Sequence, residues 1–254
     1  MDTAGIVTKL RAAGCVYAEQ EARLLTDAAS SPAELAAMVG RRVAGLPLEQ
    51  IVGWAEFCGT RIIVRPGVFV PRRRSELLAH QALSLTRPGS VVLDMCCGTG
   101  AVGAVVARAV EGVDLHAVDV DPVAVACARD NLAGLGAVYE GDLYRALPPE
   151  LRGNVGTIVA NAPYVPTDEI ALMPPEARDH EPRHALDGGR DGLDIQRRVI
   201  AEAPEWLRLN GYLMIETSGK QAPETVQAFE HHGFTARIVA SEELDATIVV
   251  GQHV

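Results

Sequence analysis

The sequence has few aromatic residues, no long hydrophobic run and no excess of positive charge. Aromatic residues make up 4% of the 254 residues, whereas hydrophobic residues as a whole make up 48% and charged residues 22%, a balance typical of globular proteins. No apolar run reaches the ~18–20 residues that a membrane-spanning helix needs, so a membrane protein is not expected. The first residues also lack a basic segment followed by an apolar one, so no secretory signal is predicted.

Basic residues are scarce in the larger, C-terminal part of the chain. Residues 1–80 hold ten basic and eight acidic residues, a net charge of +2, whereas residues 81–254 hold 13 basic and 25 acidic residues, a net charge of −12. A surface that follows a phosphate backbone needs the opposite sign. Nucleic acid is therefore disfavoured as a partner.

Cysteine is also sparse, and its positions do not form a metal-type pattern. The five cysteines are Cys15, Cys58, Cys96, Cys97 and Cys127. An odd number without such spacing predicts a reduced, cytoplasmic setting. His180 and His184 lie four residues apart, but nearby prolines argue against a helix that would bring them together. No metal site is predicted.

The pattern of apolar residues predicts a helical start, a β-hairpin and an α/β domain. Residues 3–53 predict short helices, one of them opened by a Ser31 cap and Pro32. Residues 54–70 are rich in β-branched and aromatic residues with glycine turns, which predicts a hairpin. A helix follows over 75–86. We therefore expect an N-terminal helical region at 1–53, a hairpin linker at 54–72 and a third region at 73–254.

From residue 90 onward, expected strands alternate with expected helices. Such alternation predicts a parallel sheet covered on both faces. The strands are expected at 91–95, 113–120, 137–140, 155–161 and 211–217, with an antiparallel pair at 234–240 and 246–252. A helix is expected over 193–209. Residues 164–192 have no regular period and contain four prolines, which predicts a long loop that is functional or disordered.

A glycine-rich turn follows the first strand of this domain. Asp94 ends the strand, and the small residues of Cys96–Gly100 would let the backbone approach a ligand where the next helix begins. With Gly103 the glycines fit G-x-G-x-x-G, and Asp119 lies 19 residues past Gly100. The pattern alone fits a nicotinamide dinucleotide as well as another adenosine cofactor. A packing turn without a ligand, or a redox role for the Cys96-Cys97 pair, are weaker interpretations.

Carboxylates at the ends of successive strands favour S-adenosyl-L-methionine. Asp94 would organise the turn and the cationic end of the cofactor, Asp119 would accept from the ribose hydroxyls, and Asp142 from the adenine amino group. These negative charges would repel a pyrophosphate. Asp121, before Pro122, is expected to be a helix cap. The predicted cofactor-binding residues are Asp94, Cys96, Cys97, Gly98, Thr99, Gly100, Asp119, Asp142, Leu143 and Asn161.

The fourth strand is followed by Asn161-Ala162-Pro163-Tyr164. Together with Asp94–Gly100, this tetrapeptide resembles the class I methyltransferases that methylate planar nitrogens, whose motif is usually Asn-Pro-Pro-Tyr. The segments PLEQIVGWAEFCG (47–59), VFVPRRRSELL (68–78) and EPRHALDGGRDGL (181–193) resemble the bacterial release-factor glutamine methyltransferases, in the same order. The resemblance spans roughly residues 20–250. It implies a Rossmann-like fold with a seven-stranded, mostly parallel sheet, S-adenosyl-L-methionine as cofactor and a protein glutamine as substrate.

Hydrogen-bond accounting explains why a planar nitrogen needs this tetrapeptide. The lone pair of an amide nitrogen is delocalised, so the nitrogen is a poor nucleophile. If both N–H groups donate to fixed acceptors, the lone pair can be aimed at the methyl group. Asn161 and the carbonyl of Ala162 would supply the acceptors, Pro163 stiffens the turn, and Tyr164 offers a ring face for stacking. We predict Asn161 and Tyr164 as catalytic residues, and Asn161, Ala162, Pro163 and Tyr164 as the substrate-binding residues.

Departures from the family pattern leave the substrate open. Ala162 stands where the family usually has proline, Pro71–Glu76 replaces the usual Pro-Arg-Pro sequence, and the N-terminal region is shorter. The loop at 165–192 is also rich in acidic residues, which would suit a guanidinium. The partner is therefore either a release-factor-like protein or a small guanidine or amide such as free arginine. A more ordinary account is that these acids only form a solvated loop surface. An adenine N6-methyltransferase is a distant alternative.

Overall fold

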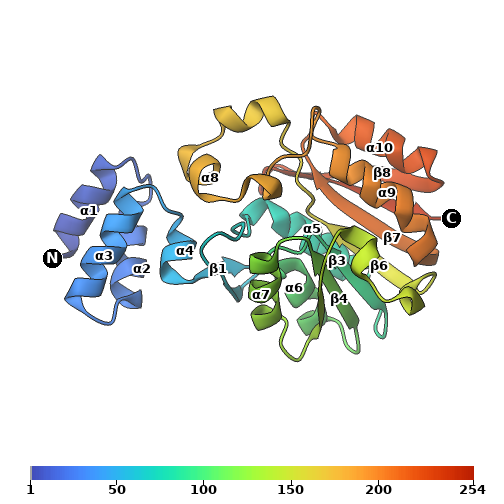
Figure 1. The fold of residues 1–254 in the computed structure, drawn as a ribbon, viewed down its shortest axis with the longest axis horizontal. Coiled ribbons are helices and arrows are strands. Elements are labelled where there is room, and N and C mark those ends of the chain that lie inside the picture. The colour runs from blue at the N-terminus through green and yellow to red at the C-terminus, as the bar shows by residue number, and fades with distance from the viewer. Residues whose placement is uncertain (1) are drawn as a thin grey trace.

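The structure, a computed structural model, describes residues 2–254. Its N-terminal region consists of short helices, namely α1 (Thr3–Ala12), α2 (Ala18–Ala28), α3 (Pro32–Val43) and α4 (Leu48–Val52). The Ser31 side chain caps α3 by accepting a hydrogen bond from the backbone N–H of Glu34, as predicted. Ile6, Leu10 and Leu25 belong to a separate apolar core inside this region. Figure 1 shows α1–α3 at one end of the molecule, away from the main sheet.

A short hairpin connects this region to the rest of the chain. Strand β1 (Trp54–Phe57) pairs with β2 (Thr60–Ile63) in antiparallel register, which confirms the hairpin, although the pairing stops before residues 64–70. Asn131 ties the hairpin to the glycine-rich turn. Its side chain accepts from the Ile63 backbone N–H at 2.8 Å and donates to the Thr99 carbonyl at 2.9 Å. The domain limits at residues 53 and 72 stay predictions.

The main sheet has the strand order β5-β4-β3-β6-β7-β9-β8 within residues 2–254. Neighbours from β5 to β7 are parallel, and β9 pairs antiparallel with both β7 and β8. The seven-stranded, mostly parallel sheet is therefore confirmed. The strands are β3 (Val91–Met95), β4 (Asp114–Asp119), β5 (Gly136–Glu140), β6 (Val155–Ala160), β7 (Leu207–Thr217), β8 (Phe234–Ser241) and β9 (Ala246–His253).

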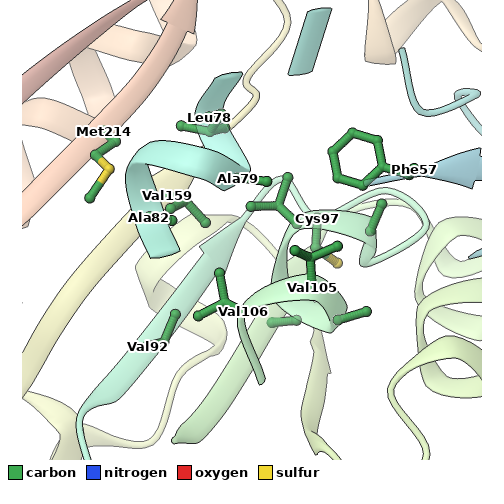
Figure 2. Close-up of a cluster of buried hydrophobic side chains, with 14 of the residues drawn as sticks. Phe57, Leu78, Ala79, Ala82, Val92, Cys97, Val105, Val106, Val159 and Met214 are labelled. Carbon is green, nitrogen blue, oxygen red and sulfur yellow. The ribbon is translucent and has the colours of Figure 1, made fainter. Parts of the chain in front are cut away.

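Helices cover both faces of the sheet, so the central strands are buried on both sides. On one face pack α5 (Glu76–Leu85), α6 (Ala101–Ala109) and α7 (Pro122–Asn131), and on the other α9 (Asp194–Trp206) and α10 (Ala222–His231). Figure 2 shows Ala82 of α5 and Val106 of α6 on the side of the sheet that carries Val92, with Leu78 one turn further along α5. Alanine, glycine and valine on α6 let this helix lie close to the strands. The single-turn helices η1 (Arg73–Ser75), η2 (Leu143–Ala146) and η3 (Pro149–Leu151) connect these elements.

Two expectations of secondary structure were wrong in part. The helix expected over 193–209 ends at Trp206, because Leu207 is already the first residue of β7 and pairs with Val155 of β6. The expected loop at 164–192 contains η4 (Thr167–Leu172), α8 (Pro175–His180) and η5 (Arg183–Ala185). Proline begins α8 and directly precedes η4 and η5, and elements this short show no period in the sequence.

Among residues 2–254, no helix combines the length and apolarity needed to cross a membrane.

Candidate active site

A cleft of about 1140 Å³ lies at the carboxyl ends of the parallel strands. This is the edge where open α/β sheets bind their ligands, and the volume is at the upper end of the usual range for ligand pockets. Of the predicted cofactor residues, all but Gly100 line it, as do the four residues of the tetrapeptide. One cleft therefore brings the two predicted sites together.

Asp94 holds the start of α6 against the sheet. Its Oδ2 accepts a hydrogen bond from the backbone N–H of Gly103 at 2.8 Å. A Cβ at Gly103 would lie 2.9 Å from that oxygen, so only glycine permits the approach. Burial raises the pKa of Asp94 to about 7, and the nearby negative charge of Asp119 adds to the rise. Asp94 thus organises the turn, as predicted.

Asp119, at the end of β4, stabilises the next two loops. Its Oδ2 accepts from the Gly98 N–H at 2.8 Å and its Oδ1 from the Asp121 N–H at 3.0 Å. Burial also raises the pKa of Asp119. Asp121 caps α7 by accepting from Val123 N, which confirms the expected cap, and its other oxygen lies 3.2 Å from His184 Nε2. The carboxylate of Asp119 therefore faces the cleft with its geometry already fixed.

Asp142 lies at the cleft but is engaged by an arginine. Both of its oxygens accept from the Arg198 guanidinium at 2.7 Å, an ion pair across 56 residues of sequence. The adenine contact predicted for Asp142 stays a prediction, in which a carboxylate oxygen would accept from the amino group beside this ion pair. Leu143 lines the cleft in a left-handed conformation with φ of 50°.

The residues of the turn have different places. Gly100 does not line the cleft; it turns the chain into α6 with φ of 73°, and a Cβ there would lie 3.0 Å from the Leu132 side chain. Cys96 faces the cleft, whereas Cys97 also packs into the core beside α5 and α6 (Figure 2). Burial raises the pKa of both thiols, so they are protonated at neutral pH, which argues against redox reactivity.

The charges of the cleft fit S-adenosyl-L-methionine. Asp94 is buried and Asp119 is half-buried, and the pKa of each is raised chiefly by removal from water, with the charge of Asp119 adding to the rise at Asp94. A cation bound between them would relieve this cost, and the cationic end of the cofactor is such a group. Gly98 has open space on the side where a Cβ would stand, which leaves room for a ligand against the backbone.

The tetrapeptide presents two free acceptors. The Asn161 side chain donates from Nδ2 to Ser75 Oγ at 3.1 Å, so its Oδ1 is turned the other way. Neither Asn161 Oδ1 nor the carbonyl oxygen of Ala162 accepts a hydrogen bond from any of residues 2–254. Both residues line the cleft. The arrangement can therefore receive two N–H groups of one planar nitrogen.

Tyr164 is fixed from behind by a buried carboxylate. Its hydroxyl donates to Glu216 Oε1 at 3.1 Å, and Glu216, at the end of β7, is 2% exposed. Burial raises the pKa of Tyr164, and the negative charge of Glu216 adds to the rise. Because the phenol stays protonated and bound, the ring is held in place at the cleft wall.

The segment at 181–193 clamps the backbone of the tetrapeptide. A Cβ at Gly188 would lie 2.7 Å from the Pro163 carbonyl oxygen, and one at Gly192 would lie 2.3 Å from that of Tyr164. Gln221 donates from one side-chain nitrogen to the carbonyls of Tyr164 and Asp191, both at 2.9 Å. This packing explains physically why the two sequence segments occur together.

Most of the loop carboxylates pair with arginines of the chain. Glu181 is buried and binds Arg72 at 2.6 Å, and Glu176 binds Arg42 of α3 at 2.8 Å. Asp179, Asp187 and Asp191 pair with Arg178, Arg183 and Arg197. Three of these ion pairs reach arginines outside the loop, and the loop carboxylates that line the cleft, Glu176, Glu181 and Asp187, are all engaged by arginines.

Sequence reasoning missed Ser75, Glu216, Gln221 and Arg198 as site residues. Each lies far in sequence from the residue it binds. Ser75 and Glu216 carried a weak signal, since Ser75 lies in the segment resembling the family and Glu216 ends a predicted strand of the sheet. Polar residues at such strand ends lie on the ligand-binding edge.

Comparison with known proteins agrees with this geometry. The family model described as "Methyltransferase small domain" matches residues 59–173. The chain is 36% identical to a release factor glutamine methyltransferase of Geobacter sulfurreducens over 230 residues, covering 88% of this chain and 80% of the relative. It is 38% identical to one of Mycolicibacterium smegmatis over 210 residues, covering 82% and 74%.

A solved structure supports the fold independently. The crystal structure of a methyltransferase from Pyrococcus furiosus superimposes with a TM-score of 0.59 at 16% identity, covering 77% of this chain and 90% of that one. This likeness concerns the fold alone. The sequence relatives are similar over most of their own length. The chain therefore belongs to the release factor glutamine methyltransferase family, whose members are S-adenosyl-L-methionine-dependent N-methyltransferases.

Proposed function

We propose that this protein methylates the side-chain amide nitrogen of a glutamine in a release factor. The observation that carries the proposal is the pair of free acceptors at Asn161 Oδ1 and the Ala162 carbonyl, in a cleft whose carboxylates suit a cation. A primary amide has two N–H groups to donate. The names of the sequence relatives support a release factor as the protein that carries this glutamine.

In this mechanism the chain mainly orients the amide. S-adenosyl-L-methionine, when bound, supplies a methyl group made electrophilic by the sulfonium. Asn161 and Ala162 hold the two N–H groups, which draws the nitrogen out of conjugation and directs its lone pair. Pro163 and Tyr164 confine the flat amide group, and Asp94 and Asp119 would hold the cofactor from the opposite side. Positioning and electrostatics therefore supply the rate enhancement.

The guanidine alternative receives no specific support. It was motivated by the acidic loop, but most of those carboxylates are engaged by arginines of the chain, so a substrate guanidinium would have to compete with existing ion pairs.

We place the activity in the cytoplasm, since the five cysteines are free thiols.

A labelling experiment tests the substrate. The protein is incubated with methyl-labelled cofactor and, in separate reactions, an intact bacterial release factor, the same factor with its acceptor glutamine replaced by alanine, free glutamine and free arginine. Label in the intact factor alone is the expected result. Label in free arginine, or in the alanine-substituted factor at the level of the intact one, would overturn the proposed substrate.

The role of Asn161 is tested with a matched control at the other end of β6. Asn161→Ala should lower kcat by roughly 100-fold or more, because one fixed acceptor is lost in the transition state. Cofactor affinity, measured by titration calorimetry, should change little. Asn154→Ala removes an exposed amide that bonds only to its own turn, and should leave kcat unchanged. Equal kcat values for the two variants would contradict the assignment.

A further inference from the structure

A single turn of the loop at 181–193 contacts both the cofactor side and the substrate side of the cleft. His184, in η5, places its Nε2 3.2 Å from Oδ2 of Asp121, which lies 63 residues earlier in the chain. Both residues line the cleft. Two residues after His184, the carbonyl oxygen of Leu186 accepts from the N–H of Val165, directly after the tetrapeptide, at 3.0 Å. The mechanism above uses neither of these contacts.

The Asp121 end of this connection belongs to the cofactor side. The Asp121 backbone N–H donates to Asp119 Oδ1 at 3.0 Å, and Asp119 Oδ2 accepts from the Gly98 N–H of the glycine-rich turn at 2.8 Å. Asp121 Oδ1 accepts from the Val123 N–H at 2.9 Å, which leaves Oδ2 for His184. Because a carboxylate only accepts, His184 Nε2 is the donor. The Asp121 side chain is 11% exposed, so water has little access to this bond.

The Leu186 end of the connection belongs to the substrate side. The Leu186 N–H donates to the Arg183 carbonyl at 3.0 Å, so η5 and the residue after it form a closed turn. Val165 is bonded to this segment twice, since its N–H donates to the Leu186 carbonyl and its own carbonyl accepts from the Gly188 N–H at 2.9 Å. A displacement of His184 therefore moves the backbone at Val165 as well.

We propose that His184 is a positioning residue that aligns the substrate-binding tetrapeptide with the turn predicted to bind the cofactor, so that binding of one ligand favours binding of the other. The inference deepens the proposed function and rests on it, because alignment matters only if a methyl group passes from the cofactor to an amide held by Asn161. It also rests on the ribose contact predicted for Asp119. Direct displacement requires the attacking nitrogen and the methyl carbon in line, so a small misplacement lowers the rate.

Binding measurements test the connection. Titration calorimetry gives the dissociation constant of an intact release factor with and without saturating S-adenosylhomocysteine, the demethylated cofactor, which cannot react. The unmodified protein should bind the release factor at least about threefold more tightly when S-adenosylhomocysteine is bound. His184→Ala should remove most of this difference and lower kcat about three- to tenfold, the scale of one hydrogen bond. The affinity for S-adenosylhomocysteine alone should change less than about twofold.

Variants at both ends of the hydrogen bond separate alignment from a merely structural role. Asp121→Ser keeps a cap for α7 but is too short to reach His184, so it should have the same effect as His184→Ala, and the double variant should be no worse than either single one. His184→Gln, whose side-chain amide can donate to Asp121, should recover most of the difference in affinity. A merely structural role predicts that the release factor binds more weakly by the same factor with and without S-adenosylhomocysteine, and that result would overturn the proposal.

Controls separate the possible failures. His231→Ala alters an exposed histidine at the end of α10 and should leave kcat and the difference in affinity unchanged. An unmodified protein that binds S-adenosylhomocysteine but methylates no release factor refutes the proposed function. An active protein whose affinity for the release factor does not depend on S-adenosylhomocysteine, or whose kcat is unaffected by His184→Ala, refutes only the role of His184.

Discussion

The burial of Asp94 in the proposed cofactor site lowers the stability of the fold, and replacing Asp94 by asparagine should reveal this cost. The carboxyl is 3% exposed, and burial raises its pKa from an ordinary 3.8 to about 7. Between these two values the folded state binds a proton that the unfolded state has lost. The free energy of unfolding therefore falls as the pH rises from about 4 to 7. Asparagine has the same shape, keeps an acceptor for the Gly103 N–H and does not titrate.

The size of the effect follows from the two pKa values. Each pKa unit corresponds to ~1.36 kcal/mol, so the raised pKa of Asp94 lowers the free energy of unfolding by ~4 kcal/mol at pH 8, where the folded carboxyl is ionised, and by about 2 kcal/mol at pH 5, where it is still protonated. Contributions of asparagine that do not depend on pH cancel when the two conditions are compared. The stability of Asp94→Asn relative to the unmodified protein should thus improve by about 2 to 3 kcal/mol between pH 5 and pH 8.

Chemical unfolding of the protein without cofactor measures this difference. Urea titrations at pH 5 and pH 8, followed by circular dichroism, give the free energy of unfolding of both proteins, provided the slopes agree. Asp27→Asn, an exposed aspartate of α2, is the control and should show no pH-dependent gain. A relative stability of Asp94→Asn that is equal at the two pH values would refute the reasoning, because it would mean that Asp94 is ionised at no extra cost.

Three further predictions concern the same cleft. Cofactor affinity of the unmodified protein should rise about tenfold from pH 6 to pH 8 as Asp94 ionises, and calorimetry should find Asp94→Asn flat across that range. Asp119→Ala should weaken cofactor binding at least tenfold, since it removes a charged acceptor and frees the Gly98 N–H; an unchanged dissociation constant would contradict the ribose assignment. Gly188→Ala should lower both the melting temperature and kcat, because its Cβ would lie 2.6 Å from the Gly192 carbonyl oxygen and 2.7 Å from that of Pro163, whereas Gly153→Ala, with open space around it, should lower kcat little.

The sequence predicted the parts of the site that follow from local pattern. Asp94, Asp119 and Asn161 each come at or directly after the end of a β-branched apolar strand, and the carboxyl ends of parallel strands meet at one edge of the sheet. Cap residues such as Asp121 could be predicted equally well, because the side chain bonds to a backbone N–H only two residues further along the chain. The order of strands and helices predicted the parallel sheet covered on both faces, and the family resemblance implied its seven-stranded, mostly parallel form.

What the sequence did not predict depends on pairs of residues far apart in the chain. Arg198 reaches Asp142 across 56 residues, and Gln221 reaches Tyr164 across 57. Arginine and glutamine on a helix look like ordinary solvated residues until the fold is known. The acidic loop resembled a guanidinium site for the same reason, since the arginines that engage Glu176 and Glu181 lie in α3 and before η1.

The carboxylates of the proposed cofactor site have two roles at the same time, and this limits which substitutions the site tolerates. Asp94 and Asp119 hold the backbone of the turn through Gly103 and Gly98, and the same carboxylates line the cleft in which we propose that the cofactor cation binds. Because the turn is fixed before the ligand arrives, little ordering remains to oppose binding. The tetrapeptide is fixed in the same way. Ser75 binds the side-chain nitrogen of Asn161 and Gln221 binds the backbone carbonyl of Tyr164, while the side-chain oxygen of Asn161 stays free. A substitution at Asp94 or Asp119 therefore alters loop geometry and charge together, and only isosteric changes such as Asp94→Asn separate the two.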